Sequence, residues 1–119
     1  MVVVEIPNLK AFRLSGESEW TTIHDFVPKS NERIKLVGLI VAGPTATTVR
    51  VLSTTDGWAT ETINMEVFLP SAGTLLVETL PVICYPNLAE EVKNVLRVQY
   101  RQEAAGPITI TLAWYLQTW

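Results

Sequence analysis

The sequence predicts an all-β protein, a single-domain antiparallel β-sandwich of the jelly-roll type with about eight strands. Three observations support this fold class. Apolar and polar residues alternate with period two in several segments, and Gly- or Pro-containing turns separate these segments about every ten residues. One short segment alone has helical spacing, so we expect at most one short helix. A chain of 119 residues is one domain, residues 1–119, and can bury a core of its own.

The clearest alternation lies in the C-terminal segment 95–119. Apolar residues occupy every second position in 96–100 and again in 108–116, with polar or mixed residues between them. Strand side chains point alternately to opposite faces, so each run places one apolar row on one face. The segment 103–107 carries Gly and Pro, which predicts that the two runs form an antiparallel hairpin at the core of a sheet.

The N-terminal half contains four further candidate strands. Val2–Ile6 is a short β-branched run that the following proline ends, and 10–14 is a second short strand. Residues 20–27 have β propensity without regular alternation. The segment 33–42 begins by alternating and becomes continuously apolar, which is typical of a strand covered on both faces, in a sandwich or at a subunit contact. Gly38 within it indicates a bulge or a close backbone approach.

The middle of the chain continues the β pattern. Residues 47–55 form a strand, and Asp56-Gly57 predicts a hairpin turn into the next strand, 58–69. The apolar segment 74–85 contains a proline, so we expect it to be split there or to lie at a sheet edge. The segment 86–94 has a capping-box pattern and helical spacing, which predicts one or two helical turns.

Composition limits the classes of partner. The formal net charge is −3 and the nine Lys and Arg residues are scattered, which argues against nucleic acid and against an anionic membrane surface. No apolar run reaches the ~20 residues that span a bilayer. Hydrophobic residues make up 48% of the chain and charged residues 18%, below the usual quarter. Some of the hydrophobic residues are therefore expected at a partner surface and not in the core. A single cysteine and the absence of a signal-peptide pattern predict synthesis and folding in the cytoplasm.

Residues with catalytic potential form no constellation in the sequence. His24 and Asp25 are neighbours on a candidate strand, so they point to opposite faces and do not orient each other. A metal site needs about three suitable ligands, and none is predicted. Cys84 lies in an apolar run typical of a buried small hydrophobe. Phosphate-binding loops, nucleophile elbows and Cys-x-x-Cys motifs are absent, so we expect neither an enzyme nor a cofactor.

Two parts of the sequence are candidates for binding a partner. The run Val2–Ile6 is a terminal strand that needs a sheet edge, in its own domain or in a neighbour. Trp58 follows a turn and Trp119 is the last residue, positions that suit an interface hot spot, a platform for a sugar ring, or a cap on the end of the core. Trp114 belongs to the apolar row of the last strand and is predicted to be core. The predicted partner-binding residues are Val2, Val3, Val4, Ile6, Trp58 and Trp119.

The chain as a whole resembles the capsid decoration, or cement, proteins of tailed phages. The resemblance rests on the extended Val2–Ile6 start, the short loops and the sandwich-like pattern that ends in 108–119. It implies a non-enzymatic virion protein, made in the host cytoplasm, that is often a trimer and stabilises the capsid shell by binding capsid subunits. A carbohydrate-binding β-sandwich that uses exposed tryptophans is the alternative.

Overall fold

The computed structural model describes residues 2–16, 18–88, 91–104 and 106–119, and for residues 79 and 80 it describes the backbone alone. These residues form eight strands and no helix, so none of them lies in a helix long and apolar enough to cross a membrane. The strands, in chain order, are β1 (Val4–Leu14), β2 (Thr21–Phe26), β3 (Glu32–Gly43), β4 (Thr47–Thr54), β5 (Thr62–Leu69), β6 (Gly73–Cys84), β7 (Val95–Gln102) and β8 (Ile108–Thr118).

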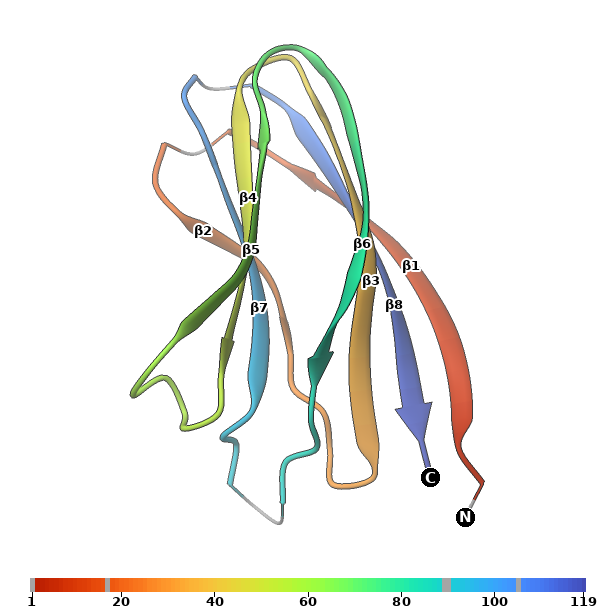
Figure 1. Ribbon diagram of the computed structural model, residues 1–119. Helices are drawn as coiled ribbons and strands as arrows, with labels where there is room; N and C mark the ends of the chain where they lie inside the picture. The colour runs from red at the N-terminus through yellow and green to blue at the C-terminus, as the bar shows by residue number, and fades with distance from the viewer. Residues whose placement is uncertain (1, 17, 89–90, 105) are drawn as a thin grey trace.

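The strands form two antiparallel four-stranded sheets that pack face to face (Figure 1). Sheet A has the order β1-β8-β3-β6 and sheet B the order β2-β7-β4-β5. Along the chain only β4 and β5 are consecutive strands of one sheet, and every other connection crosses between the sheets. This interleaved order is that of a jelly roll, which confirms the predicted fold class.

The predicted hairpin between 96–100 and 108–116 is wrong. Both runs are strands, but β7 pairs with β2 and β4 in sheet B, whereas β8 pairs with β1 and β3 in sheet A. Period two tells which side chains share a face but not which strand lies alongside. The apolar row of β7 faces the core from sheet B, and the apolar row of β8 faces it from sheet A. Each strand therefore alternates in sequence just as it would if the two strands were paired in a hairpin.

The core lies between the two sheets and is built from these alternating rows. The inner row of β8 contributes Ile108, Ile110 and Leu112, and the row of β7 contributes Leu96 and Val98, all of them buried. The inner rows of β3 and β4 complete this cluster. Burial of one row from every central strand sets the register of both sheets, because a slip by one residue would turn each row to the outside.

The N-terminal strand is longer than the sequence predicts. Val2–Ile6 and 10–14 do not form two short strands, because β1 continues through Pro7 and pairs with β8 along its whole length. Proline is tolerated there because β1 is an edge strand, where a missing N–H can face away from the partner strand. β6, at the other edge of sheet A, contains Pro81, which confirms the predicted edge position.

Gly38 lies at an irregularity in β3, as predicted. The pairing of β3 with both β6 and β8 shifts between Leu36 and Gly38. A Cβ atom on Gly38 would lie 3.2 Å from the backbone oxygen of Val77. Glycine therefore permits the close approach of β6 at this point.

Two local predictions in the middle of the chain fail. The fifth strand begins at Thr62 and not at Trp58, because residues 55–61 form a turn that includes Gly57 and Trp58, both with positive φ. In the segment 86–94, residues 86–88 and 91–94 form no helix, and residues 89 and 90 lie outside the described residues. A buried asparagine organises this segment instead, as described below.

Candidate interaction surfaces

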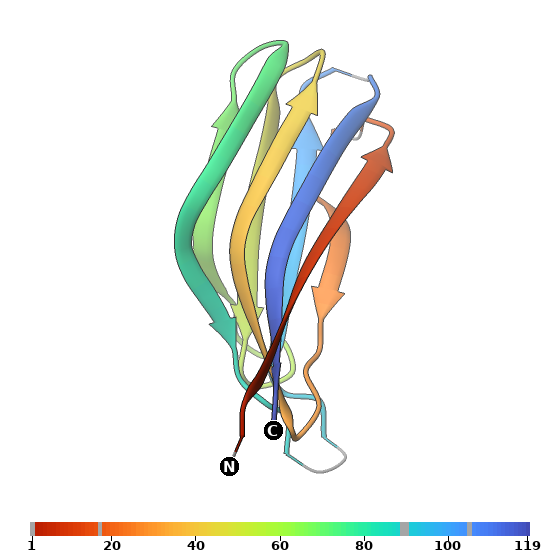
Figure 2. The ribbon, with the colours of Figure 1, turned by 90° about the vertical axis from the view of Figure 1, so that its right-hand side faces the viewer.

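The outer face of sheet A carries apolar side chains that the described residues leave at least partly uncovered. Figure 2 views this face, with β6, β3, β8 and β1 side by side. Leu9 pairs with Ala113, while the next residue, Lys10, pairs with the core residue Leu112, so Leu9 points outward. We call this surface the apolar face and define it by Leu9, Ala11, Val37, Ile40, Leu76 and Ala113.

The apolar face is hollowed along its middle. Leu9 on β1 is 74% exposed and Leu76 on β6 is 58% exposed, whereas the small residues Gly38 and Ala113 lie on the two central strands. Two adjoining depressions of about 240 and 250 Å³ lie there and share Leu9, Val37 and Ala113 among their lining residues. The continuous apolar run of β3 predicted that both faces of this strand are covered. Within this chain, sheet B covers the inner face of β3, and no described residue covers the outer face.

A polar network borders the apolar face near the chain termini. The Nε atom of Arg33 donates a hydrogen bond of 2.6 Å to Oε1 of Gln117. The Nε2 atom of Gln117 donates one of 2.5 Å to Oε2 of Glu5. This network joins β3, β8 and β1, and it fixes the Glu5 carboxylate on the outer face of the edge strand.

The outer face of sheet B is different in character, because arginines there stack on tryptophans. The guanidinium of Arg97 lies 4.2 Å from the centre of the Trp58 ring. It also donates hydrogen bonds of 2.7 and 2.9 Å to the two oxygens of Asp25. Arg50 and Arg101 lie 3.9 and 4.7 Å from the centre of the Trp20 ring. Such cation–π contacts stabilise a solvated face and use ring surface that a ligand would need.

Trp58 therefore differs from the other predicted partner-binding residues. Its side chain is half-buried, Arg97 lies against its ring, and it belongs to the outer face of sheet B. It offers little open ring surface for stacking on a sugar. The sequence contained a signal for this arrangement, because Arg97 and Arg101 occupy the outer row of β7, where an arginine can reach an indole from a neighbouring loop.

The remaining predicted partner-binding residues gather at one end of the sandwich. Val4 pairs with Thr118, so the start of β1 lies beside the C-terminal Trp119, and both termini emerge at this end (Figure 2). Val2 is 79% exposed and Trp119 is 41% exposed. Val3, Val4 and Ile6, the other predicted residues of this run, are also exposed.

The segment between β6 and β7 adds apolar side chains to the same end (Figure 1). Tyr85, Leu88 and Val92 are exposed in this segment, Leu88 by 80%. Sequence reasoning missed them because the segment resembled a helix, in which Leu88 and Val92 would share one buried face. We call the exposed set the terminal end and define it by Val2, Val3, Val4, Tyr85, Leu88, Val92 and Trp119.

Asn87 holds the segment that presents these side chains. Its side chain is buried, and its Nδ2 atom donates hydrogen bonds of 2.9 Å to the backbone oxygens of Pro28 and Asn94. Its Oδ1 atom accepts hydrogen bonds from the backbone N–H groups of Lys93 and Asn94 at 2.8 and 2.7 Å. A fully hydrogen-bonded buried amide restricts the backbone that it joins, so Asn87 ties the backbone at Lys93 and Asn94 to that at Pro28.

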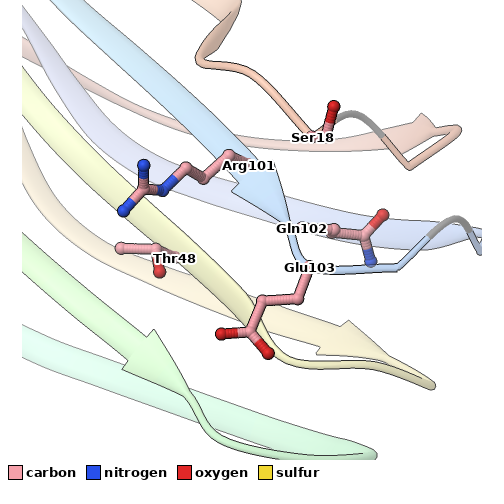
Figure 3. Close-up of a pocket in the computed structure, with 5 residues that line it drawn as sticks. All are labelled: Ser18, Thr48, Arg101, Gln102 and Glu103. Carbon is pink, nitrogen blue, oxygen red and sulfur yellow. The ribbon is translucent and has the colours of Figure 1, made fainter.

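A polar pocket of about 350 Å³ lies at the opposite end of the molecule. It is lined by Ser18, Thr48, Arg101, Gln102 and Glu103 (Figure 3). The buried Gln102 amide donates to the hydroxyls of Thr45 and Thr47, and its Oε1 atom accepts no hydrogen bond from the described residues. Figure 3 shows this amide pointing away from Arg101, Thr48 and Glu103. The polar groups of the pocket therefore do not converge on one ligand position.

The two residues with reactive side chains have structural surroundings. His24 packs among Phe12, Phe26 and Trp114, and burial, followed by the positive charge of Lys10, lowers its pKa. Asp25 points to the other face of the sheet, as predicted. Burial raises the pKa of the Cys84 thiol to about 11, which keeps it protonated. Among the described residues, no group of three or more His, Cys, Asp or Glu side chains could hold a metal ion.

Comparisons with known proteins show the fold. No protein-family model and no curated protein matches the sequence. A structure of Bacillus endospore appendages, described as a novel family of disulfide-linked pili, superposes with a TM-score of 0.56 at 9% identity, over 99% of this chain and 90% of that chain. A structure of infectious bursal disease virus, Gx strain, gives a TM-score of 0.50 at 7% identity, over 98% of this chain and 36% of that chain. This chain thus spans about a third of the viral chain's length.

Proposed function

We propose that this protein is a non-enzymatic structural component of a virus particle, a decoration protein that binds the capsid shell and stabilises it. The jelly roll supports this class, since the fold is common in viral capsid and lectin domains. Its similarity in fold to a pilus structure and to a virus structure supports a role in assembly. Localisation on the virion and synthesis in the host cytoplasm belong to the same proposal.

The terminal end is the observation that carries the proposal. Exposed apolar side chains lie at this end of the sandwich, beside both chain ends and in the segment between β6 and β7, and exposed apolar area of this kind is typical of a surface that binds a partner. Full burial of a Val or Leu side chain contributes roughly 1.5–3 kcal/mol. A contact that buries the terminal end therefore supplies several such contributions, and the apolar face offers a second area of the same chemistry.

Binding of this kind stabilises a shell through mass action. A protein that binds the assembled lattice but not the free subunits adds about 3 kcal/mol for each site occupied at a hundred times its dissociation constant. Repeated over many sites, such contacts strengthen the shell without any single one being tight. The contacts are non-covalent, because Cys84 is the only cysteine and is buried, in contrast to the pili described as disulfide-linked.

The copy number is separate from the proposed binding to the shell. The resemblance to decoration proteins implies a trimer, and a native mass in solution measures it. The carbohydrate-binding alternative depended on exposed rings at Trp58 and Trp119. Because Arg97 stacks on Trp58, the Trp58 ring no longer supports this alternative.

Co-sedimentation with empty shells of the virus that encodes the chain tests the proposal. The intact protein should sediment with the shells. The Val2→Ser, Val3→Ser double variant should bind at least about a hundredfold more weakly, since two buried valines together contribute about 3 kcal/mol or more to the contact. The β1 strand begins at Val4, so the variant should remain folded.

Phe68→Ser is the matched control. Phe68 is also exposed, but it lies on β5, outside the terminal end, so its binding should stay within about twofold of the intact protein. An intact protein that remains in the supernatant would contradict the proposal. Equal losses in the double variant and the control would show that the terminal end is not the contact.

A further inference from the structure

The outer edge of β1 is an open sheet edge of unusual length. β1 is an edge strand of sheet A and has eleven residues, Val4–Leu14. It pairs with β8 along one edge, and its other edge has no neighbouring strand among the described residues (Figure 2). Leu9, at its midpoint, is 74% exposed, and Ile6 is exposed as well. Natural proteins usually shorten or cover such an edge, because its free N–H and C=O groups can pair with another chain.

β1 is chemically complementary to itself about Leu9. Residues equally far from Leu9 match as cross-strand partners: Glu5 with Arg13 by opposite charge, and Ile6 with Phe12 by apolar contact. The ends of the strand, Val4 and Leu14, are both apolar. The two inner pairs, Pro7 with Ala11 and Asn8 with Lys10, contain no like charges.

We propose that β1 pairs with β1 of a second copy, antiparallel, about a two-fold axis at Leu9. A two-fold contact places each residue opposite its mirror position, so one self-complementary strand satisfies both sides. Sheet A of each copy then continues into the other. Glu5 of each copy lies opposite Arg13 of the other on the outer face, on the same side as the apolar face, which continues across the contact.

The backbone permits this pairing at a limited cost. Because proline has no N–H, Pro7 fits β1 when its nitrogen faces the open edge. Glu5, Leu9 and Arg13 lie an even number of residues away, so their backbone groups face the same edge. The ladder between the copies loses one hydrogen bond at each Pro7 and keeps those of the other edge-facing residues.

The other edge of sheet A lacks these properties. The pairing of β6 with β3 shifts register between Leu36 and Gly38, and a bulge of this kind bends a strand and disfavours pairing with a further chain. The proposed contact makes a dimer of the isolated protein, in place of the trimer that the resemblance implies. It requires no shell, so its test is independent of the proposed function.

Native mass spectrometry and light scattering on the intact chain at high micromolar concentration test the contact, with a dimer expected. Glu5→Arg alone places two like-charge pairs across the axis and should weaken the dimer roughly tenfold, as should Arg13→Glu alone. The double variant Glu5→Arg, Arg13→Glu exchanges the charges and should restore dimerisation. Because Glu5 also accepts a hydrogen bond from Gln117, this restoration separates the contact between copies from loss of the network within one copy.

A cysteine at the axis supplies a second measurement. Opposite residues of a hydrogen-bonded antiparallel pair have Cα atoms about 5.5 Å apart, within the range that a disulfide bridges. Leu9→Cys should therefore form a disulfide-linked dimer under mild oxidation, whereas Leu76→Cys, exposed on β6, should not. A monomer at all concentrations, a double variant no better than the single ones, or cross-linking at position 76 instead of 9 would each overturn the proposal.

Discussion

Asp56 fixes the turn between β4 and β5. Its carboxylate accepts hydrogen bonds from the Thr60 N–H at 2.9 Å, from the Thr60 hydroxyl at 2.5 Å and from the Thr54 hydroxyl at 2.8 Å. These hydrogen bonds, with those from Thr60 first, lower the pKa of Asp56 to about 2 because they stabilise the charged form. The turn that positions Trp58 over Arg97 thus depends on an ionised carboxylate.

A pH dependence follows for this residue. Because the pKa of Asp56 is lower in the folded chain than its usual value near 4, its contribution to stability is complete above that value and is lost as pH falls towards 2. We expect an NMR titration to give a pKa near 2, and Thr60→Val to raise it, since the hydroxyl donor is removed. Thr55→Val, the same change at the neighbouring threonine, should leave the pKa in place. An ordinary pKa in the intact protein would contradict this account.

At the scale of the strand, the position of a strand in its sheet decides how deeply its apolar row is buried. β8 is central in sheet A, between β1 and β3, and its apolar row faces sheet B. The row is fully buried from Ile108 to Leu112, while Trp114 is half-buried and packs on Phe26, with 5.0 Å between ring centres. Trp114, which the sequence predicts to be core, is thus only partly buried and packs against the core.

The strand-scale prediction is that Trp114→Ala costs about 3 kcal/mol of unfolding free energy. The variant removes ring contacts with Phe26 and His24 and leaves a cavity at the end of the core row. A urea titration followed by circular dichroism measures the loss. Trp119→Ala, at an exposed indole, should change the free energy by less than about 0.5 kcal/mol. A comparable loss in both variants would show that the row does not depend on the Trp114 ring.

At the scale of the whole molecule, the two outer faces and the two ends differ. Sheet B carries arginines that pair with Asp25 or pack on indole rings. Sheet A carries the apolar face, and the terminal end carries further apolar groups beside both chain ends. A molecule with this asymmetry is suited to lie against other protein surfaces by one sheet and one end.

The corresponding prediction concerns nucleic acid. The net charge is −3, and the arginines of sheet B are engaged with Asp25 and with tryptophan rings, so a phosphate backbone would find no free basic stripe among the described residues. Fluorescence anisotropy with a random duplex at physiological salt should show no binding at micromolar protein. Micromolar affinity would contradict the proposed role as a protein that binds other proteins.

The strand content and fold class were predictable from the sequence because they depend on local patterns. Alternation with period two, broken by Gly and Pro, places strands near their observed bounds, and the proline in β6 predicts an edge. A strand near the N-terminus was predicted, but its continuation through Pro7 into a single strand with residues 10–14 was not.

Strand pairing was decided only by the tertiary structure. A period-two row packs equally well in either sheet, so the segments 95–102 and 108–118 could not reveal that they belong to different sheets. The same holds for residues whose surroundings come from distant segments: Arg97 covers Trp58, and Asn87 ties the segment before β7 to Pro28. Local sequence fixes which face a side chain occupies, whereas long-range packing determines what lies on that face.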